Sequence, residues 1–120
     1  MDVAKEILND IIRREQIAKP ITIDKIQKIV AKHYHIDLKD MRSKKRTDAI
    51  ALPRQIAMYI SRNLTELSTI EIGDSFGGKD HTTVIYALNR VEERLGVDEA
   101  FAREVVLLRA RLVERFRASE

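Results

Sequence analysis

The sequence FGGKDHTT at residues 76–83 decides the fold of this 120-residue chain, because it puts a sharp break between two helical patterns. Upstream, Ser68 is followed three residues later by a glutamate, the spacing of a capping box for a short helix over residues 69–75. Downstream, Asp80 is a suitable cap for a longer helix over residues 81–95. Two helices of unequal length joined by a tight glycine turn are typical of a helix-turn-helix unit.

Apolar residues recur at helical spacing along the rest of the chain, and no strand pattern or internal repeat is visible. The sequence therefore predicts an all-α fold. The expected helices, in chain order, cover residues 2–16, 23–35, 38–42, 48–64, 69–75, 81–95 and a last stretch after residue 98. Asp48 should cap the fourth of these helices, and Gly96 should end the sixth.

Each expected helix has an apolar stripe that should face a common core. The residues predicted to form this core are Ile26, Ile29, Val30, His33, Ile56, Ile60, Leu64, Val84, Leu88, Val91, Leu95, Phe101, Val105, Leu108 and Leu112, with Met41 and Met58 filling gaps.

The chain length suits one domain with one modest core. We expect residues 20–120 to form the helix-turn-helix domain, as a Trp-repressor-like helical cluster, and residues 1–19 to form a linker helix that ends before Lys19-Pro20. No signal peptide and no apolar run of membrane-spanning length is visible, and the chain has no cysteine. These features predict a cytoplasmic protein without a membrane partner.

The formal net charge of +3 is only mildly basic, but the charge is unevenly distributed. Between Lys39 and Arg62 lie seven basic residues and two acidic ones, so this window carries +5 and the remainder carries −2. A concentrated basic patch on a nearly neutral body is what a polyanion ligand requires. Because the patch directly precedes a helix-turn-helix unit, we predict that the ligand is double-stranded DNA.

The helix that follows Asp80 begins with side chains that can read base edges in the major groove. Histidine at position 81 can donate to guanine or thymine, and Thr82 offers a hydroxyl and a methyl group. Asp80 can accept from the amino group of cytosine. We therefore predict base contacts by these three residues, and phosphate contacts by Lys79 and Arg90 on either side of them.

Residues 43–47, with the sequence SKKRT, should form an exposed basic loop. An arginine on such a loop can enter a minor groove, where A·T-rich DNA deepens the negative potential. Arg46 is the candidate for this contact. The side chains of Arg54 and Gln55, early in the next helix, suit phosphates.

Four stretches resemble the C-terminal DNA-binding domain of DnaA, the bacterial chromosomal replication initiator. They are TIDKIQ at 22–27, SKKR at 43–46, PRQIAM at 53–58 and GDSFGGKDHTTV at 73–84. The similarity extends in the correct order over roughly residues 20–112. It implies binding to DnaA boxes, which are short asymmetric duplex sites at the replication origin, by a monomeric domain on the bacterial nucleoid.

The resemblance also implies roles for individual residues. It implies major-groove readout by Asp80, His81 and Thr82, and minor-groove readout by Arg46. The expected phosphate contacts, including those of the basic loop, are Lys44, Lys45, Thr47, Arg54, Gln55, Arg62, Lys79, Thr83 and Arg90. Asp48 departs from the family pattern, which often has a basic residue there. Lys79 replaces a commoner arginine, keeping the charge but losing its bidentate geometry.

No enzymatic activity and no cofactor is expected for this chain. The resemblance implies that residues 1–19 link to an AAA+ ATPase domain, which the chain lacks and in which the family binds ATP. Gly73, Gly78 and Lys79 have most of the spacing of a phosphate-binding loop, but a true loop follows a strand and has serine or threonine after the lysine. Here a helical pattern precedes it and Asp80 follows.

Other interpretations remain open or are weak. His33 and His35 lack the cysteine or carboxylate spacing of a metal site. His81 has no nucleophile beside it for general-base catalysis. The basic window could instead bind an acidic protein, and a transcription regulator could use the same DNA-reading domain. A nucleotide-binding enzyme is the remaining alternative.

Overall fold

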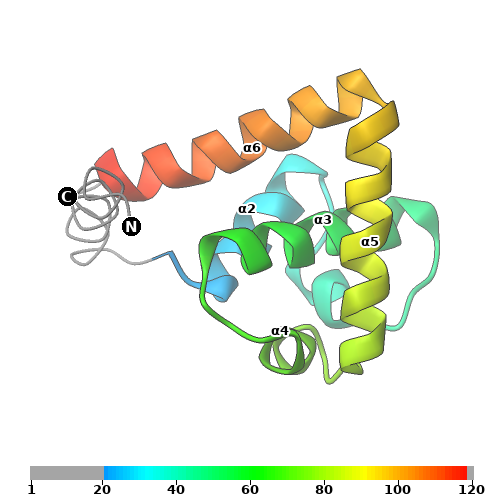
Figure 1. Cartoon of the computed structure of the whole chain (residues 1–120). Helices are drawn as coiled ribbons and strands as arrows, with labels where there is room; N and C mark the ends of the chain where they lie inside the picture. Colours follow the sequence, from blue (N-terminus) through cyan, green and yellow to red (C-terminus); the bar gives the residue numbers. More distant parts are fainter. Residues whose placement is uncertain (1–20, 119–120) are drawn as a thin grey trace, which may run out of the picture.

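The chain is helical along most of residues 21–118, which are the residues that the computed structural model describes (Figure 1). The elements are α2 (Ile23–His33), the 3₁₀ helix η1 (Leu38–Arg42), α3 (Asp48–Leu64), α4 (Thr69–Ser75), α5 (His81–Val97) and α6 (Glu99–Ala118). The predicted all-α fold is confirmed over this range. The linker helix predicted at 1–19 lies outside the described residues.

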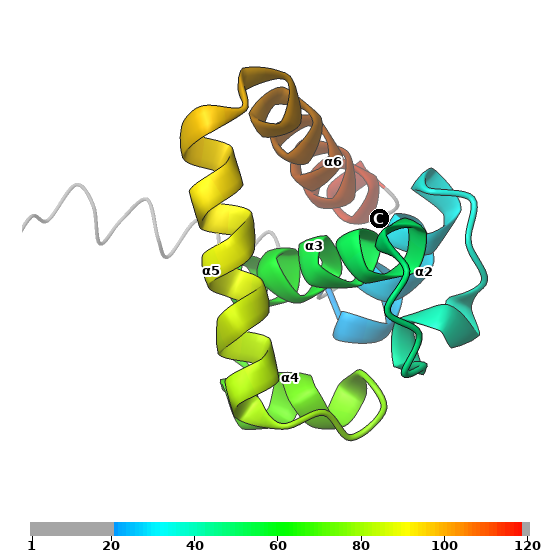
Figure 2. The ribbon, with the colours of Figure 1, turned by 90° about the vertical axis from the view of Figure 1, so that its right-hand side faces the viewer.

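Helix α3 lies in the middle of the molecule, and the other helices pack around it. Helix α5 crosses α3, with α4 at its beginning and α6 at its end (Figures 1 and 2). Helix α2 packs on α3 from another side. The start of α5 lies beside α4, at a corner of the molecule (Figure 1).

The predicted core is largely confirmed. Ten of the predicted residues have at most 4% of their surface exposed: Ile26, Val30, Ile56, Ile60, Val84, Val91, Phe101, Val105, Leu108 and Leu112. Ile29, Leu64, Leu88 and Leu95 are partly buried at the edge of the same cluster, and Met41 and Met58 lie within it. His33 is wrong as a core residue, because its ring is partly exposed and its Nε2 atom lies 3.3 Å from a carboxylate oxygen of Glu104.

Helix α2 ends two residues earlier than predicted, at His33. His35 adopts a left-handed conformation with φ of 56°, and its N–H donates to the Lys32 carbonyl. The next N–H, from Ile36, donates to the Ala31 carbonyl at 3.0 Å. These two bonds form a Schellman turn, which satisfies the last carbonyls of the helix and reverses the chain.

Two further helix ends differ from the prediction by one or two residues. Thr47, and not Asp48, is the residue before α3. Asp48 is in the first turn, where its negative charge interacts favourably with the helix dipole. Helix α5 continues through Gly96 to Val97. It stops there because Asp98 is extended and its carboxylate accepts the N–H of Phe101, at the start of α6.

The turn of the helix-turn-helix unit is held by close backbone contacts. Phe76 is completely buried, and Gly77 and Gly78 follow with φ of 89° and 76°. A Cβ atom at Gly77 would overlap the carbonyl oxygen of Arg42, and one at Gly73 would overlap that of Lys79. Glycine is therefore required at 73 by space, and at 77 by both space and conformation.

We predict opposite stability effects of alanine at two glycines. Gly77→Ala should lower the free energy of unfolding by at least about 1–2 kcal/mol, because alanine is strained at positive φ and here also meets Arg42. Gly96→Ala should raise it by up to about 1 kcal/mol, since Gly96 is helical with open space around it. Urea unfolding of both variants would check this, and a stable Gly77→Ala protein would contradict the role of the turn.

Candidate nucleic-acid interface

The first residues of α5 project from the corner of the molecule. The Asp80 carboxylate accepts the Thr82 N–H at 3.4 Å and lies 3.0 Å from Nδ1 of His81. The helix-capping bond lowers the pKa of Asp80, with a smaller contribution from His81. The side chains of Asp80 and His81 are 66% and 50% exposed, so the cap leaves both accessible to a ligand. The three predicted base-reading residues therefore lie together at one exposed helix start.

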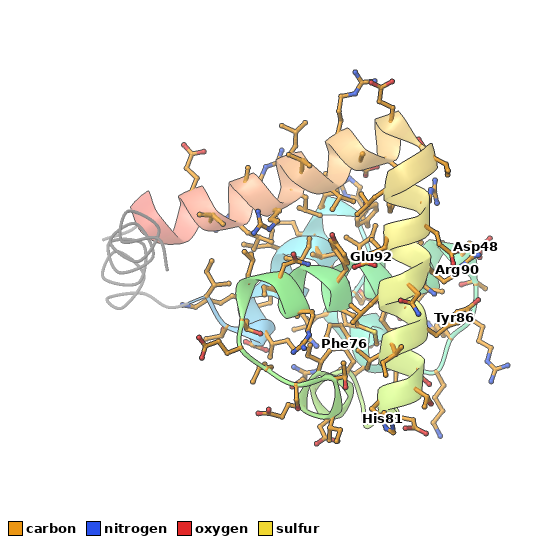
Figure 3. The ribbon with its side chains drawn as sticks, in the orientation of Figure 1. Asp48, Phe76, His81, Tyr86, Arg90 and Glu92 are labelled. Carbon is orange, nitrogen blue, oxygen red and sulfur yellow. The ribbon has the colours of Figure 1, made fainter. Side chains whose placement is uncertain are left out.

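The outer side of α5 continues this surface. Figure 3 shows His81 at the start of the helix, and Tyr86 and Arg90 further along on the side that Asp48 also occupies. Thr83, Tyr86 and Arg90 are all exposed. Their spacing of three and four residues puts them along one face of the helix.

An open groove of about 780 Å³ joins this face of α5 to the basic loop and to the start of α3. Its lining includes six cationic side chains and one acidic one, so its electrostatic field favours a polyanion. The lining residues are Lys44, Arg46, Asp48, Ala51, Leu52, Arg54, Gln55, Lys79, Thr83, Tyr86, Arg90 and Arg94.

The structure thus brings together seven of the ten residues predicted to contact phosphates or the minor groove. Lys44, Arg46, Gln55, Thr83 and Arg90 line the groove with Arg54 and Lys79. Arg46 is exposed, and its guanidinium has no hydrogen bond or ion pair within residues 21–118. It is therefore available for a ligand.

Arg54 has a different position from that of a simple surface cation. Only 7% of its surface is exposed, and its guanidinium donates to the carbonyl oxygens of Asp40 at 3.2 Å, Ser43 at 3.0 Å and Lys45 at 2.6 Å. Burial lowers the pKa of Arg54, and the nearby Asp40 carboxylate partly offsets this. Arg54 holds the basic loop in shape, and its contact with phosphate stays a prediction.

Lys79 is also bonded within the protein. Its ammonium donates to the carbonyl oxygens of Ser43 at 2.7 Å and Phe76 at 2.8 Å. Burial lowers the pKa of Lys79, and the positive charges of Arg54 and Lys44 lower it further. The lysine thereby ties the basic loop to the turn before α5.

Three of the predicted phosphate contacts lie off the groove. The ammonium of Lys45 lies 3.2 Å from the buried carboxylate of Asp40. Thr47 precedes α3 as its cap residue and is exposed. Arg62 lies at the other end of α3 and donates to the Leu67 carbonyl at 2.7 Å. Their contacts with DNA stay predictions.

The phosphate-binding-loop interpretation of residues 73–79 does not fit this geometry. Gly73 is a buried residue of a helix, and no strand precedes it within the described part of the chain. Lys79 is turned toward two backbone carbonyls. A phosphate-binding loop needs free backbone N–H groups and a lysine that points at the ligand.

Sequence reasoning missed two groove residues with polar side-chain groups, Tyr86 and Arg94. Both continue the helical spacing from Thr83 through Arg90, which was the available signal. Tyr86 has 59% of its surface exposed, so its ring is accessible from the groove. Arg94 is partly engaged, because it lies 3.4 Å from Asp98 and 4.4 Å from the centre of the Phe101 ring.

Within residues 21–118, no group of three or more histidine and carboxylate side chains could hold a metal ion. No helix in this range is long and apolar enough to cross a membrane.

Comparison with known proteins gives a family match and similarity to solved structures. Residues 23–91 match the family model described as the bacterial DnaA protein helix-turn-helix. A solved structure titled as a DNA replication initiation factor is 33% identical, with a TM-score of 0.72. That similarity covers 91% of this chain and 32% of the other, so this chain spans about a third of that protein's length. The glycine turn, the exposed start of α5 and the basic groove agree with the family match. The chain belongs to the bacterial DnaA helix-turn-helix family.

Proposed function

We propose that this chain binds short asymmetric duplex sites of the DnaA-box type and thereby acts in the initiation of chromosome replication. In this proposal the start of α5 lies in the major groove, and the basic loop at 43–47 lies in the adjacent minor groove. The observation that carries the proposal is the continuous cationic groove, which runs from the loop to the outer face of α5. The family match and the replication-factor likeness support it.

The two DNA-reading segments have different chemistry, and this supports an asymmetric site. His81 and Thr82 present ring nitrogens and a hydroxyl, which suit the varied donor and acceptor pattern of the major groove. Arg46 presents a free cation, which suits a narrow and strongly negative minor groove. Because one chain has both segments, one copy defines the direction of the site and no second copy is required.

The proposal predicts a defined consensus in a selection from random duplexes. One strongly preferred asymmetric sequence should emerge, with an A·T-rich part beside the part read by α5. A flat profile would overturn the proposal. If an acidic protein were the partner instead, the chain would bind acidic peptides and show no preference among duplexes.

His81→Ala should remove discrimination at the bases that α5 reads. We expect binding to the selected duplex to weaken by about 1–3 kcal/mol, and binding to a scrambled duplex to change little. Fluorescence anisotropy titrations on both duplexes would measure this. Equal losses on the two duplexes would exclude base readout by His81.

Arg90→Ala should weaken binding to both duplexes alike, because a phosphate contact carries no base information. The slope of the logarithm of the binding constant against that of salt concentration should become shallower by about one unit. Arg103→Ala is the matched control, since Arg103 is exposed on α6 and does not line the groove. A selective loss on the preferred duplex would show that Arg90 reads bases.

A further inference from the structure

We propose that Arg54 and Lys79 are positioning residues that fix the basic loop relative to α5, so that the two DNA-reading segments act as one rigid unit. This inference rests on the proposed function. It gives these two cations a role different from the phosphate contacts that their charge suggests.

The loop needs such fixing because it has little regular structure of its own. In η1 and the loop that follows it, the carbonyls of residues 40, 43 and 45 point toward Arg54, and carbonyls that are buried or partly buried require donors. The guanidinium of Arg54 supplies donors to three carbonyls, on residues 40, 43 and 45. The hydroxyl of Ser43 closes the network by donating to the Asp40 carbonyl at 3.0 Å.

The carbonyl of Ser43 is the point at which the loop joins the helix-turn-helix unit. It accepts from Arg54 at 3.0 Å and from Lys79 at 2.7 Å. Lys79 immediately precedes Asp80, the cap of α5, and Arg46 lies three residues beyond Ser43. A short bonded path therefore connects the start of α5 to the minor-groove arginine.

A second contact holds the same two segments together. The turn packs on η1 so closely that a Cβ at Gly77 would overlap the Arg42 carbonyl. The guanidinium of Arg42 donates to the buried side chain of Gln27, whose amide donates to the Ser75 carbonyl at 2.9 Å. This arrangement positions η1 against the end of α4, and Lys79 then fixes the loop that follows η1.

The two roles for Lys79 predict different binding behaviour. A phosphate-binding lysine contributes equally to every sequence and about one unit to the salt slope. A positioning lysine acts through Arg46, so its loss should reduce discrimination only at the base pairs that the loop reads. Lys44 provides the matched comparison, because it lines the same groove and its ammonium has no bond within the described residues.

The test uses Lys79→Met, Lys79→Arg and Lys44→Met, titrated on the selected duplex and on duplexes changed in the minor-groove part or in the α5 part. Lys79→Met should lose roughly tenfold in discrimination against changes in the minor-groove part, and should keep discrimination in the α5 part. Lys79→Arg should keep the discrimination in the minor-groove part, because arginine can still donate to the carbonyls of Ser43 and Phe76. Lys44→Met should weaken binding to all duplexes alike and lower the salt slope.

Amide exchange of residues 43–47 in the free protein provides a measurement that does not depend on DNA. Lys79→Met should exchange faster there than the wild type, and Lys44→Met should not. If Lys79→Met unfolds, Arg54→Lys serves instead, because lysine keeps the charge but cannot span the carbonyls of residues 43 and 45. Circular dichroism would establish that each variant is folded.

The outcomes separate this inference from the proposed function. A wild type that distinguishes no duplexes would overturn the DnaA-box proposal. The amide exchange would still show whether Arg54 and Lys79 fix the loop. If amide exchange of the loop is unchanged in both Lys79→Met and Arg54→Lys, the inference that these residues fix the loop is overturned. A uniform loss for Lys79→Met with a lower salt slope would make Lys79 a phosphate contact and overturn the positioning role.

Discussion

Inward-turned carbonyl groups of the loop at residues 43–45 need hydrogen-bond donors, and two cationic side chains supply them. Arg54 comes from α3 and Lys79 from the turn before α5, and both donate to Ser43. A carbonyl without a donor in a partly buried site destabilises the folded state. These bonds therefore favour one conformation of the loop. The position of the basic loop, and with it the loop side of the groove, follows from these bonds.

The groove consequently contains two kinds of cation. Arg54 and Lys79 are bonded to the backbone and have lowered pKa values because they are partly buried. Lys44, Arg46 and Arg90 are exposed on the same surface. The bonded cations still contribute positive potential, but the exposed ones have side chains that can follow a ligand. A surface that binds a polyanion can in this way use part of its charge to hold its own shape.

Much of the fold could be predicted from local pattern. The helices, the capping box at Ser68 and most of the core follow from the 3.6-residue period and from cap chemistry, which depend on neighbours in sequence. The errors lie at or beside helix ends, including His33, the last residue of α2, which is not part of the core. His35 takes a left-handed conformation without being glycine. Gly96 stays helical because α5 ends only at Asp98, the single residue between α5 and α6. Such choices depend on which nearby group satisfies the last carbonyls, and spacing does not show this.

By itself, the sequence determined that the chain is a helix-turn-helix domain with a basic segment ahead of it, because both properties are local in the chain. It also placed His81 and Thr82 at an exposed helix start. Only the tertiary structure decided which cations are free and which are engaged, since Arg54 and Lys79 bond to carbonyls 9–14 and 36 residues away in sequence. These bonds form because packed elements bring each side chain close to carbonyls that are distant in sequence, and no local sequence pattern shows such proximity.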